Sequence, residues 1–358
     1  MAHSPLFEPL ILPNGATLKN RLAKAAMEES LAAYGQLPDA KLHHLYQRWA
    51  AGGAAVLITG NVMVSPNALS GPASVVLQKG TDLAPFKAWA EAGRSGGGEF
   101  WMQINHPGRQ VMASLGEETV SASDIAVAIP GMEKNFAKPR ALREAEIQDI
   151  IERFATTAAL AEEAGFTGVQ IHAAHGYLIN QFLSPLSNRR EDEWGGSLEN
   201  RARLLFETVR AVRAGVSDKF TVTVKLNSAD FQKGGFELED AKWVVAQLSE
   251  MPVDLVEVSG GSYESPAMSG RREDGTSTGR REAYFVDFAR EVAAIAKMPI
   301  MVTGGIRSKA VAEAALTNRT GGIGVSVLGM ARALAFEPDL INQWKHGMAP
   351  EVTIPQVN

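Results

Sequence analysis

The chain has 358 residues, of which 45% are hydrophobic and 21% charged, and its formal net charge is −5 at pH 7. This composition is typical of a globular protein with a large core, and without a basic block or tail it argues against nucleic acid as a partner. The absence of cysteine excludes a disulfide framework, a thiolate metal site and a cysteine nucleophile.

The N-terminal residues Met1–Leu10 lack the basic and apolar regions of a signal peptide. No stretch approaches the ~20 apolar residues that a membrane span requires. A chain without cysteine is also compatible with a reducing compartment. We therefore expect a soluble, cytoplasmic protein without a membrane partner.

The chain opens with a predicted hairpin, followed by eight predicted strands. Residues Leu6–Leu18 carry a Pro-Asn-Gly turn and predict a hairpin that caps the bottom of the fold. The strands are short apolar runs rich in β-branched residues: Arg21–Met27, Ala54–Asn61, Glu99–His106, Gly168–Ala174, Phe220–Asn227, Leu255–Gly260, Ile300–Gly305 and Gly322–Gly329. Most are apolar at nearly every position, which is typical of strands buried on both faces.

Segments with apolar residues at helical spacing lie between the strands. They are Ala40–Ala51, Leu83–Arg94, Glu144–Ala164, Leu198–Ala214, Leu238–Glu250, Tyr284–Ala296 and Ser308–Leu316. A strand followed by a helix, repeated about eight times, predicts parallel pairing. We expect one α/β domain spanning residues 1–358, a (β/α)8 TIM barrel. An open doubly wound sheet is the alternative, but neither a switch point nor helices on two faces are indicated.

Three segments are long for barrel loops: Pro107–Arg143, Ile179–Ser197 and Gly261–Glu282. All three follow strands, so we expect them on the C-terminal face, where barrel active sites lie. The third carries mixed charge at 271–274 and 280–282, which we interpret as a solvated loop.

Two imidazoles and a phenol follow the fourth strand. His172, His175 and Tyr177 are placed by it at the C-terminal end of the barrel. Imidazole can donate a hydrogen bond to a carbonyl oxygen, and tyrosine can give a proton to carbon. Two structural histidines are an equally good interpretation of the spacing alone. A metal pair is disfavoured because no clear third ligand and no thiolate lie nearby.

The stretch His-Ala-Ala-His-Gly-Tyr-Leu-Ile-Asn-Gln-Phe-Leu-Ser-Pro, beginning at His172, closely resembles the signature of the Old Yellow Enzyme family. The resemblance continues at Leu18–Arg21, Gln103–Arg109, Trp194–Arg201 and Val302–Ile306. It implies an FMN-dependent ene-reductase that uses NADH or NADPH to reduce the activated C=C bond of an α,β-unsaturated carbonyl or nitro compound. The branch with an iron–sulfur domain is excluded by the missing cysteines and length.

The resemblance also implies a role for each residue of the cluster. His172 and His175 would bind the activating oxygen of the substrate, which stabilises the enolate-like transition state. Tyr177 would protonate the α carbon. Nicotinamide and substrate would use the same pocket in turn, which predicts ping-pong kinetics. Tyr263, after the sixth strand, would cover the flavin or contact the substrate, or simply pack in its loop.

The same mapping implies the flavin contacts. Ala25, Ala26, Met27 and Glu28 would border the ring, with Asn61 and Gln103 at its pyrimidine side and Lys225 near N1 and O2. Gly304 and Gly305, with Ala331 and Arg332 opening the next helix, would bind the phosphate, although the glycines alone indicate only a tight turn. No dinucleotide fingerprint is present, so NADH or NADPH would dock on the flavin face.

Three positions depart from the family pattern. Glu28 stands where a hydroxyl or thiol often donates to flavin O4, and we hypothesise that it tunes the flavin potential, unless it points away into a salt bridge. Lys225 stands where many members have arginine, so the charge is kept and the bidentate fork is lost. Ala26 replaces a frequent proline. Asn105, where some members have a bulky aromatic residue, predicts a roomy pocket.

Two other classes of function remain as alternatives. A barrel aldolase or isomerase acting on a phosphorylated substrate would use the same phosphate position, with Lys225 as the only candidate for a Schiff-base lysine. A flavin-dependent sensor would not turn over substrate. Within the family, a dehydrogenase or nitro-ester reductase is open, and a homo-oligomer is possible.

Overall fold

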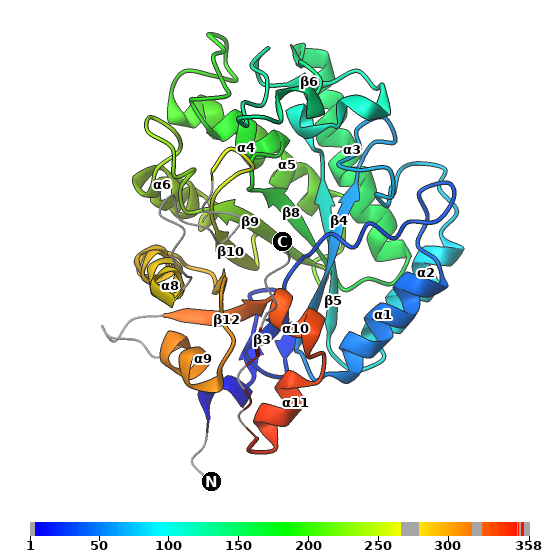
Figure 1. The fold of residues 1–358 in the computed structure, drawn as a ribbon, viewed down its shortest axis with the longest axis vertical. Helices are drawn as coiled ribbons and strands as arrows, with labels where there is room; N and C mark the ends of the chain where they lie inside the picture. Colours follow the sequence, from blue (N-terminus) through cyan, green and yellow to red (C-terminus); the bar gives the residue numbers. More distant parts are fainter. Residues whose placement is uncertain (1–3, 266–278, 317–323, 349, 351, 354–358) are drawn as a thin grey trace.

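The computed structural model describes residues 4–265, 279–316, 324–348, 350 and 352–353. Its centre is a closed barrel of parallel strands, in the order β10-β11-β12-β3-β4-β5-β8-β9 (Figure 1). The strands are β3 (Leu22–Lys24), β4 (Val56–Met63), β5 (Glu99–Asn105), β8 (Gly168–Ala173), β9 (Thr221–Asn227), β10 (Leu255–Ser259), β11 (Ile300–Thr303) and β12 (Val325–Met330). The predicted TIM barrel is therefore confirmed.

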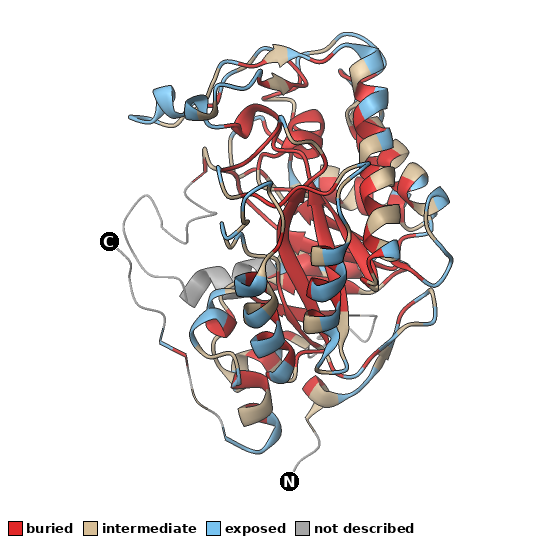
Figure 2. Ribbon diagram, turned by 90° about the vertical axis from the view of Figure 1, so that its right-hand side faces the viewer, coloured by how far each residue is buried: buried red, intermediate tan, exposed pale blue. Residues whose placement is uncertain are grey.

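Helices surround the barrel and turn their exposed residues outward, while the strands are buried (Figure 2). The helices are α1 (Ala40–Ala51), α2 (Ala84–Arg94), α3 (Glu144–Glu163), α4 (Leu178–Leu183), α5 (Leu198–Ala214), α6 (Leu238–Leu248), α8 (Gly279–Ala293), α9 (Lys309–Leu316), α10 (Arg332–Phe336) and α11 (Leu340–Lys345). Side-chain caps fix some starts: Asp39 accepts from the Lys41 N–H before α1, and Ser197 from the Asn200 N–H before α5.

Several predicted boundaries were wrong. The first strand ends at Lys24, not Met27, because Lys24 is its last residue in register with β12 and β4. The predicted helix Tyr284–Ala296 runs from Gly279 to Ala293, since a polar first turn carries no apolar periodicity. Gly322, the predicted start of the last strand, lies outside the described residues, as do the charges at 271–274.

Side chains of each strand alternate between the barrel interior and the helices. Leu255, Met301 and Val327 fill the lower interior together with Trp101, whereas their strand neighbours pack against the helical layer. The hairpin of β1 (Leu10–Ile11) and β2 (Thr17–Leu18) adds apolar side chains to this lower cluster. Its Asn14 donates to the Lys219 carbonyl and Thr221 hydroxyl oxygens at the start of β9, both at 3.0 Å. The predicted cap is confirmed, and it closes the N-terminal end of the barrel.

The long segments extend from the C-terminal ends of the strands, as predicted. The first contains a two-stranded parallel sheet of β6 (Val120–Ser121) and β7 (Arg140–Ala141), of which β6 is labelled near the top of Figure 1. Short 3-10 turns also occur at Pro5–Phe7, Gly108–Gln110, Ala113–Leu115 and Glu133–Asn135. The second segment is not all loop, because α4 occupies its first residues. The third is described only to Ser265 and again from Gly279.

Candidate active site

The upper part of the barrel interior is polar, in contrast to its apolar floor. His172, Lys225 and Glu257 lie at one level, since His172 pairs in register with Lys225 and Lys225 with Glu257. Residues in register on adjacent strands point to the same side of the sheet. The three side chains therefore meet inside the barrel at its C-terminal end.

The structure brings together the predicted cluster of His172, His175 and Tyr177. The ring centroids of His172 and Tyr177 lie 4.8 Å apart, nearly perpendicular at 81°. Those of the two histidines lie 5.2 Å apart at 78°. The side chains of His172 and Tyr177 are only 3% and 5% exposed. Two rings that can donate a proton therefore lie next to each other in a buried part of the barrel.

The hydrogen bonds of His172 define which nitrogen carries its proton. The Ala174 backbone N–H donates to Nδ1 at 3.2 Å, so Nδ1 is an acceptor and the neutral ring holds its proton on Nε2. Burial, then the neighbouring His175 and Lys225, lowers the pKa of His172 well below its usual value. His172 is therefore a neutral Nε2–H donor at physiological pH.

His175 is held by a strained turn. Its φ of 60° lies in the left-handed region, which non-glycine residues rarely adopt. The side-chain oxygen of Asn227 accepts from the His175 N–H at 3.2 Å, and that of Asn180 accepts from the Gly176 N–H at 2.7 Å. His175 Nε2 is already 2.8 Å from the Ser259 hydroxyl, so this nitrogen is engaged with the protein. The turn directs the chain from β8 to Tyr177 and α4.

Tyr177 shares its hydroxyl with two other predicted residues. The Tyr263 hydroxyl lies 2.9 Å from the Tyr177 hydroxyl, and Asn61 Nδ2 donates to it at 3.5 Å. Burial, then Tyr263 and Glu28, raises the pKa of Tyr177 well above its usual value. The phenol therefore keeps its proton at neutral pH, as a proton donor must.

The segment after β3 lies beside β4, whose Gly60 N–H donates to the Glu29 carboxylate. Ala25 is buried in the interior cluster, and Ala26 and Met27 are half-buried. Glu28 is exposed, and its carboxylate accepts a 2.7 Å hydrogen bond from the Ser70 hydroxyl. Desolvation raises the pKa of Glu28, and the Ser70 hydrogen bond opposes this effect. Among the described residues it forms no ion pair, and the alternative of a salt bridge stays a prediction.

A buried network that the sequence did not reveal anchors this segment. Lys24 is 0% exposed and points outward from β3 to the Tyr46 hydroxyl at 3.0 Å and the Ile58 carbonyl at 2.9 Å. Tyr46 donates to Glu29, whose carboxylate lies 3.7 Å from Lys24. Burial lowers the pKa of Lys24 to about 8, while Glu29 opposes the change. A lysine within an apolar strand was the signal that could have found it.

A chain of side chains crosses the barrel interior below the mouth. Gln103 Nε2 donates to Gln170 Oε1 at 2.8 Å, and Gln170 Nε2 donates to Glu257 Oε2 at 2.7 Å. The other oxygen of Glu257 lies 2.9 Å from Lys225 Nζ. The predicted flavin residues Gln103 and Lys225 are thus linked through two residues that had not been predicted.

The predicted phosphate residues lie at the ends of the adjacent strands β11 and β12. Gly304 and Gly305 follow β11, and the φ of 61° at Gly305 favours glycine. Ala331 precedes α10, whose first residue is the exposed Arg332. Backbone N–H groups and a cation are suited to a phosphate at this position of a barrel.

Unpaired buried atoms indicate that this mouth suits a flavin ring. The side-chain oxygens of Asn61 and Asn105 are buried without a hydrogen-bond partner in the described structure. Such acceptors need a donor from a ligand or water. The pyrimidine edge of a flavin has an N–H donor, which suits the amide oxygens here, that of Gln103 included, and carbonyl oxygens, which suit Lys225. The residues present therefore fit FMN.

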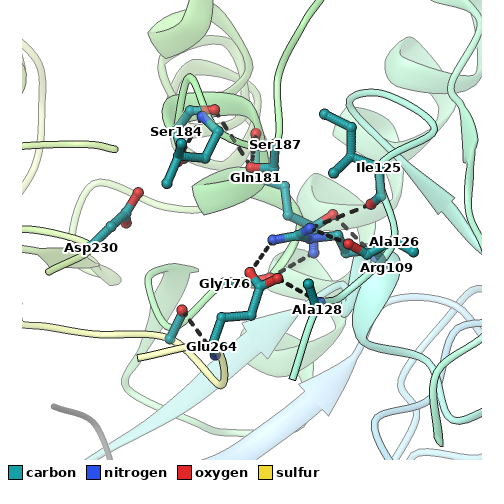
Figure 3. A network of polar contacts seen from close by, with 12 residues as sticks. Arg109, Ile125, Ala126, Ala128, Gly176, Gln181, Ser184, Ser187, Asp230 and Glu264 are labelled. Carbon is teal, nitrogen blue, oxygen red and sulfur yellow. Dashed lines mark hydrogen bonds and ion pairs between the residues drawn. The ribbon is translucent and has the colours of Figure 1, made fainter. Parts of the chain in front are cut away.

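An ion pair joins two of the long segments above the site. Arg109 lies between the Glu264 carboxylate and the carbonyl oxygens of Ile125 and Ala126 (Figure 3). The Arg109–Glu264 contact is 2.5 Å, and the side chains are 8% and 11% exposed. The other Glu264 oxygen accepts from the Ala128 N–H at 2.7 Å. Because Glu264 follows Tyr263, this clamp holds the tyrosine in its loop.

Fold and site together define a class of protein, a TIM-barrel enzyme whose polar mouth suits a planar redox cofactor. A sequence model of the NADH:flavin oxidoreductase / NADH oxidase family matches residues 5–351. The chain is 38% identical over 350 residues to the NADH-dependent flavin oxidoreductase iliE of Hypocrea jecorina (strain QM6a), covering 92% of this chain and 86% of that protein. The chain belongs to the NADH:flavin oxidoreductase / NADH oxidase family, with FMN as cofactor and NADH or NADPH as reductant.

Solved structures confirm the resemblance to Old Yellow Enzyme. A 2-naphthoyl-CoA reductase bound to 2-naphthoyl-CoA superposes with a TM-score of 0.83 and 27% identity, over 96% of this chain and 52% of that one. The Old Yellow Enzyme homologue from Zymomonas mobilis has a TM-score of 0.79 and 24% identity, over 97% and 94% of the chains. The similarity to the Zymomonas mobilis protein shows a shared fold only.

The described residues contain neither a candidate membrane span nor a candidate metal site. No helix among them has the length and apolar character to cross a membrane. No group of three or more of their His, Asp or Glu side chains could hold a metal ion. The pair His172 and His175 thus has no third ligand within the described part of the chain.

Proposed function

We propose that this enzyme reduces the activated C=C bond of α,β-unsaturated carbonyl or nitro compounds with NADH or NADPH. The observation that carries the proposal is the juxtaposition of His172, a neutral Nε2–H donor, and Tyr177, a protonated phenol, with ring centroids 4.8 Å apart. One donor suits the activating oxygen and the other the α carbon. When bound, FMN would supply the redox chemistry, a hydride that comes from the nicotinamide and goes to the β carbon.

Each residue of the cluster has a separate task in this proposal. His172 donates to the substrate oxygen and draws charge from the C=C bond. His175 is the second donor to that oxygen and exchanges its bond to Ser259 for it. Tyr177 delivers its phenolic proton to the α carbon, and Tyr263 contacts the substrate and holds the Tyr177 hydroxyl. Hydride and proton together saturate the bond.

The residues proposed to hold FMN line the barrel mouth. They are Ala25, Ala26, Met27, Glu28, Asn61, Gln103 and Lys225 at the ring, and Gly304, Gly305, Ala331 and Arg332 at the phosphate. The proposal places all of them in one domain, residues 1–358. A single pocket for nicotinamide and oxidant makes the kinetics ping-pong. The absence of cysteine supports a cytoplasmic site of action.

A Schiff-base aldolase is a weaker interpretation of the same barrel. Lys225 Nζ lies 2.9 Å from the Glu257 carboxylate and is thus engaged in an ion pair. A nucleophilic lysine instead needs an apolar pocket or a neighbouring cation. The membership of the chain in a flavin oxidoreductase family also argues against an aldolase.

The test is anaerobic reduction of the purified protein by NADH and by NADPH, followed by reoxidation with a panel of compounds. We expect rapid reoxidation by enones, maleimides and nitroalkenes. Reoxidation by nitrate esters alone would instead indicate a nitro-ester reductase, and oxidation of an amine substrate a dehydrogenase. Protein that retains no flavin after purification with excess FMN would refute the proposal.

A further inference from the structure

An acidic side chain lies inside the barrel beside the residues proposed to bind the flavin ring. Glu257 is 0% exposed and sits at the level of Lys225, its register partner on β9. One carboxylate oxygen lies 2.9 Å from Lys225 Nζ, and the other accepts from Gln170 Nε2 at 2.7 Å. An ionised carboxylate inside a barrel is costly unless both oxygens are paired in this way.

The carboxylate determines the direction of the chain of amides. A carboxylate only accepts hydrogen bonds, so Gln170 must turn its N–H group toward Glu257 and its oxygen toward Gln103. Gln103 then donates to that oxygen at 2.8 Å, which leaves its own carbonyl oxygen outside the chain of bonds. Reversing Gln170 would place its oxygen against the carboxylate and its N–H group against that of Gln103, and reversing Gln103 would place two amide oxygens against each other. Because all three side chains are at most 3% exposed, water cannot relieve either mismatch.

The same carboxylate balances the charge of Lys225. Opposite charges 2.9 Å apart cancel most of each other's field at positions beyond the pair. Without Glu257, the positive charge of Lys225 would stabilise negative charge that develops on any neighbouring group. When it is paired with Glu257, Lys225 can still donate a hydrogen bond, but its positive charge stabilises a nearby negative charge less.

We propose that Glu257 is a positioning residue that orients Gln103 as a hydrogen-bond acceptor for FMN and neutralises Lys225, thereby lowering the midpoint potential of the bound flavin. This inference rests on the proposed placement of FMN at the barrel mouth. The residue acts through Gln170 and Lys225 and has no role in the transfer of hydride or protons.

The experiment measures the midpoint potential and the FMN dissociation constant of Glu257→Gln. Reduction adds negative charge to the flavin, so removal of a nearby carboxylate favours the reduced form. We expect the affinity ratio of reduced to oxidised FMN to rise at least tenfold, about 30 mV for a two-electron couple. An unchanged potential would overturn the inference.

Asp254→Asn is the matched control. Asp254 lies immediately before β10, is 4% exposed, accepts from the Val222 N–H and lies 3.9 Å from Arg213. It is thus a buried carboxylate near a cation at the opposite end of the same strand. Its substitution should lower stability and leave the potential unchanged. A shift as large as that of Glu257→Gln would overturn the inference, because any buried acid would then have the effect.

A second pair of variants decides the question if Glu257→Gln does not fold. Lys225→Met leaves the carboxylate unbalanced and should lower the potential. Lys225→Met combined with Glu257→Gln removes both charges and should return the potential toward the parental value. A double variant that keeps the potential of Lys225→Met would show that Glu257 is only a packing partner, which overturns the inference.

Gln170→Met tests the amide chain without a change of charge. It should weaken FMN binding severalfold, because the orientation of Gln103 is no longer fixed, and should leave the potential near the parental value. An unchanged dissociation constant would overturn the positioning part. If the parent protein binds FMN and reduces enones but Glu257→Gln does not change its midpoint potential, this inference alone is refuted. A parent that retains no FMN refutes the proposed function as well.

Discussion

The hydroxyl oxygens of Tyr177 and Tyr263 lie 2.9 Å apart, so that one phenol donates a hydrogen bond to the other. The two residues follow different strands, β8 and β10, and their ring centroids are 6.0 Å apart. Burial is the largest cause that raises the pKa of each phenol. Both therefore stay protonated at neutral pH, and Tyr263 fixes the direction in which the Tyr177 hydroxyl points.

Replacement of Tyr177 by phenylalanine should separate the two half-reactions. Reduction of bound FMN by NADH or NADPH needs no proton from this residue and should keep its rate. Reoxidation by an enone should slow by about 10²–10⁴-fold, the usual contribution of a positioned acid. Stopped-flow absorbance of the flavin measures both rates. If reoxidation keeps its parental rate, Tyr177 is not the proton donor.

Tyr263→Phe is the companion variant, because it removes only the hydrogen bond to Tyr177. We expect reoxidation to slow by about fivefold, in line with about 1 kcal/mol for one net hydrogen bond. The double variant with Tyr177→Phe should be no slower than Tyr177→Phe alone, since both act through one hydroxyl. Additive effects would assign Tyr263 a separate role.

His172→Ala should weaken the binding of a phenolate inhibitor more than His175→Ala does. His172 Nε2–H is directed by the bond at Nδ1, whereas His175 Nε2 is engaged with Ser259. Loss of a hydrogen bond to a charged ligand costs about 1.5–3 kcal/mol, or about 10- to 100-fold in affinity. Titration of the long-wavelength charge-transfer band measures it. A band that persists in the double variant contradicts the assignment.

The free energy of unfolding should fall as the pH drops below about 6.5. Burial lowers the pKa of His106 to about 4 and those of His172 and His175 well below the usual value. The unfolded chain then binds more protons than the folded one, so stability present above pH 6.5 is lost toward the folded-state pKa values, at about 1.4 kcal/mol per pH unit for each histidine. Urea unfolding at several pH values measures the slope.

His106→Asn isolates one of these contributions outside the catalytic cluster. His106 Nδ1 accepts from the Gly108 N–H at 3.1 Å, a bond that an asparagine oxygen can replace. The variant should lose one histidine's share of the slope between about pH 6.5 and 5 and run parallel to the parent above pH 7. Identical slopes would show that His106 does not titrate on unfolding.

Loss of the Arg109–Glu264 clamp should affect substrate binding and stability together. Glu264→Ala leaves a nearly buried guanidinium without its partner, which costs about 3 kcal/mol. Because Tyr263 precedes Glu264, we expect the KM for enones to rise with little change in kcat. Thermal unfolding and steady-state kinetics measure the two effects. Glu118→Gln, at an exposed ion pair with Arg140, should change neither; equal effects would contradict the role of the clamp.

Glu28→Thr tests whether the acid at the mouth tunes the flavin. Desolvation raises the pKa of Glu28, while Ser70 stabilises its charged form. Threonine removes a carboxylate and adds a hydroxyl donor, so we expect the midpoint potential to rise by about 30 mV for each tenfold gain in relative affinity for reduced FMN. An unchanged potential removes the hypothesis. Ser70→Ala is a control that keeps the carboxylate.

Much of the fold could be predicted because the barrel strands are continuous apolar runs. Leu255–Gly260 and Glu99–His106 each differ from the observed strand by one residue at one end. The helix at Tyr284–Ala296 was misplaced because the first turns of α8 are polar and carry no periodicity. Periodicity detects a helix through apolar residues that recur on one face, so it does not detect a helical turn without them.

The site was only partly predictable, since its partners come from strands distant in sequence. His172, His175 and Tyr177 stand within six residues, and their spacing alone placed them at one strand end. Glu257 and Gln170 had no such signal, because each looks like an isolated polar residue in an apolar strand. Only the register of β5, β8, β9 and β10 shows that they meet.

The closed floor of the barrel has a kinetic consequence. Trp101 and Met301, each 0% exposed, and the hairpin beneath them leave the mouth as the entrance to the proposed pocket. A spent nicotinamide must therefore diffuse out before an oxidant can enter. At high concentration, the nicotinamide should bind to the reduced enzyme and the oxidant to the oxidised enzyme, and each then blocks the pocket. The initial velocity should therefore pass through a maximum as the concentration of either reactant rises.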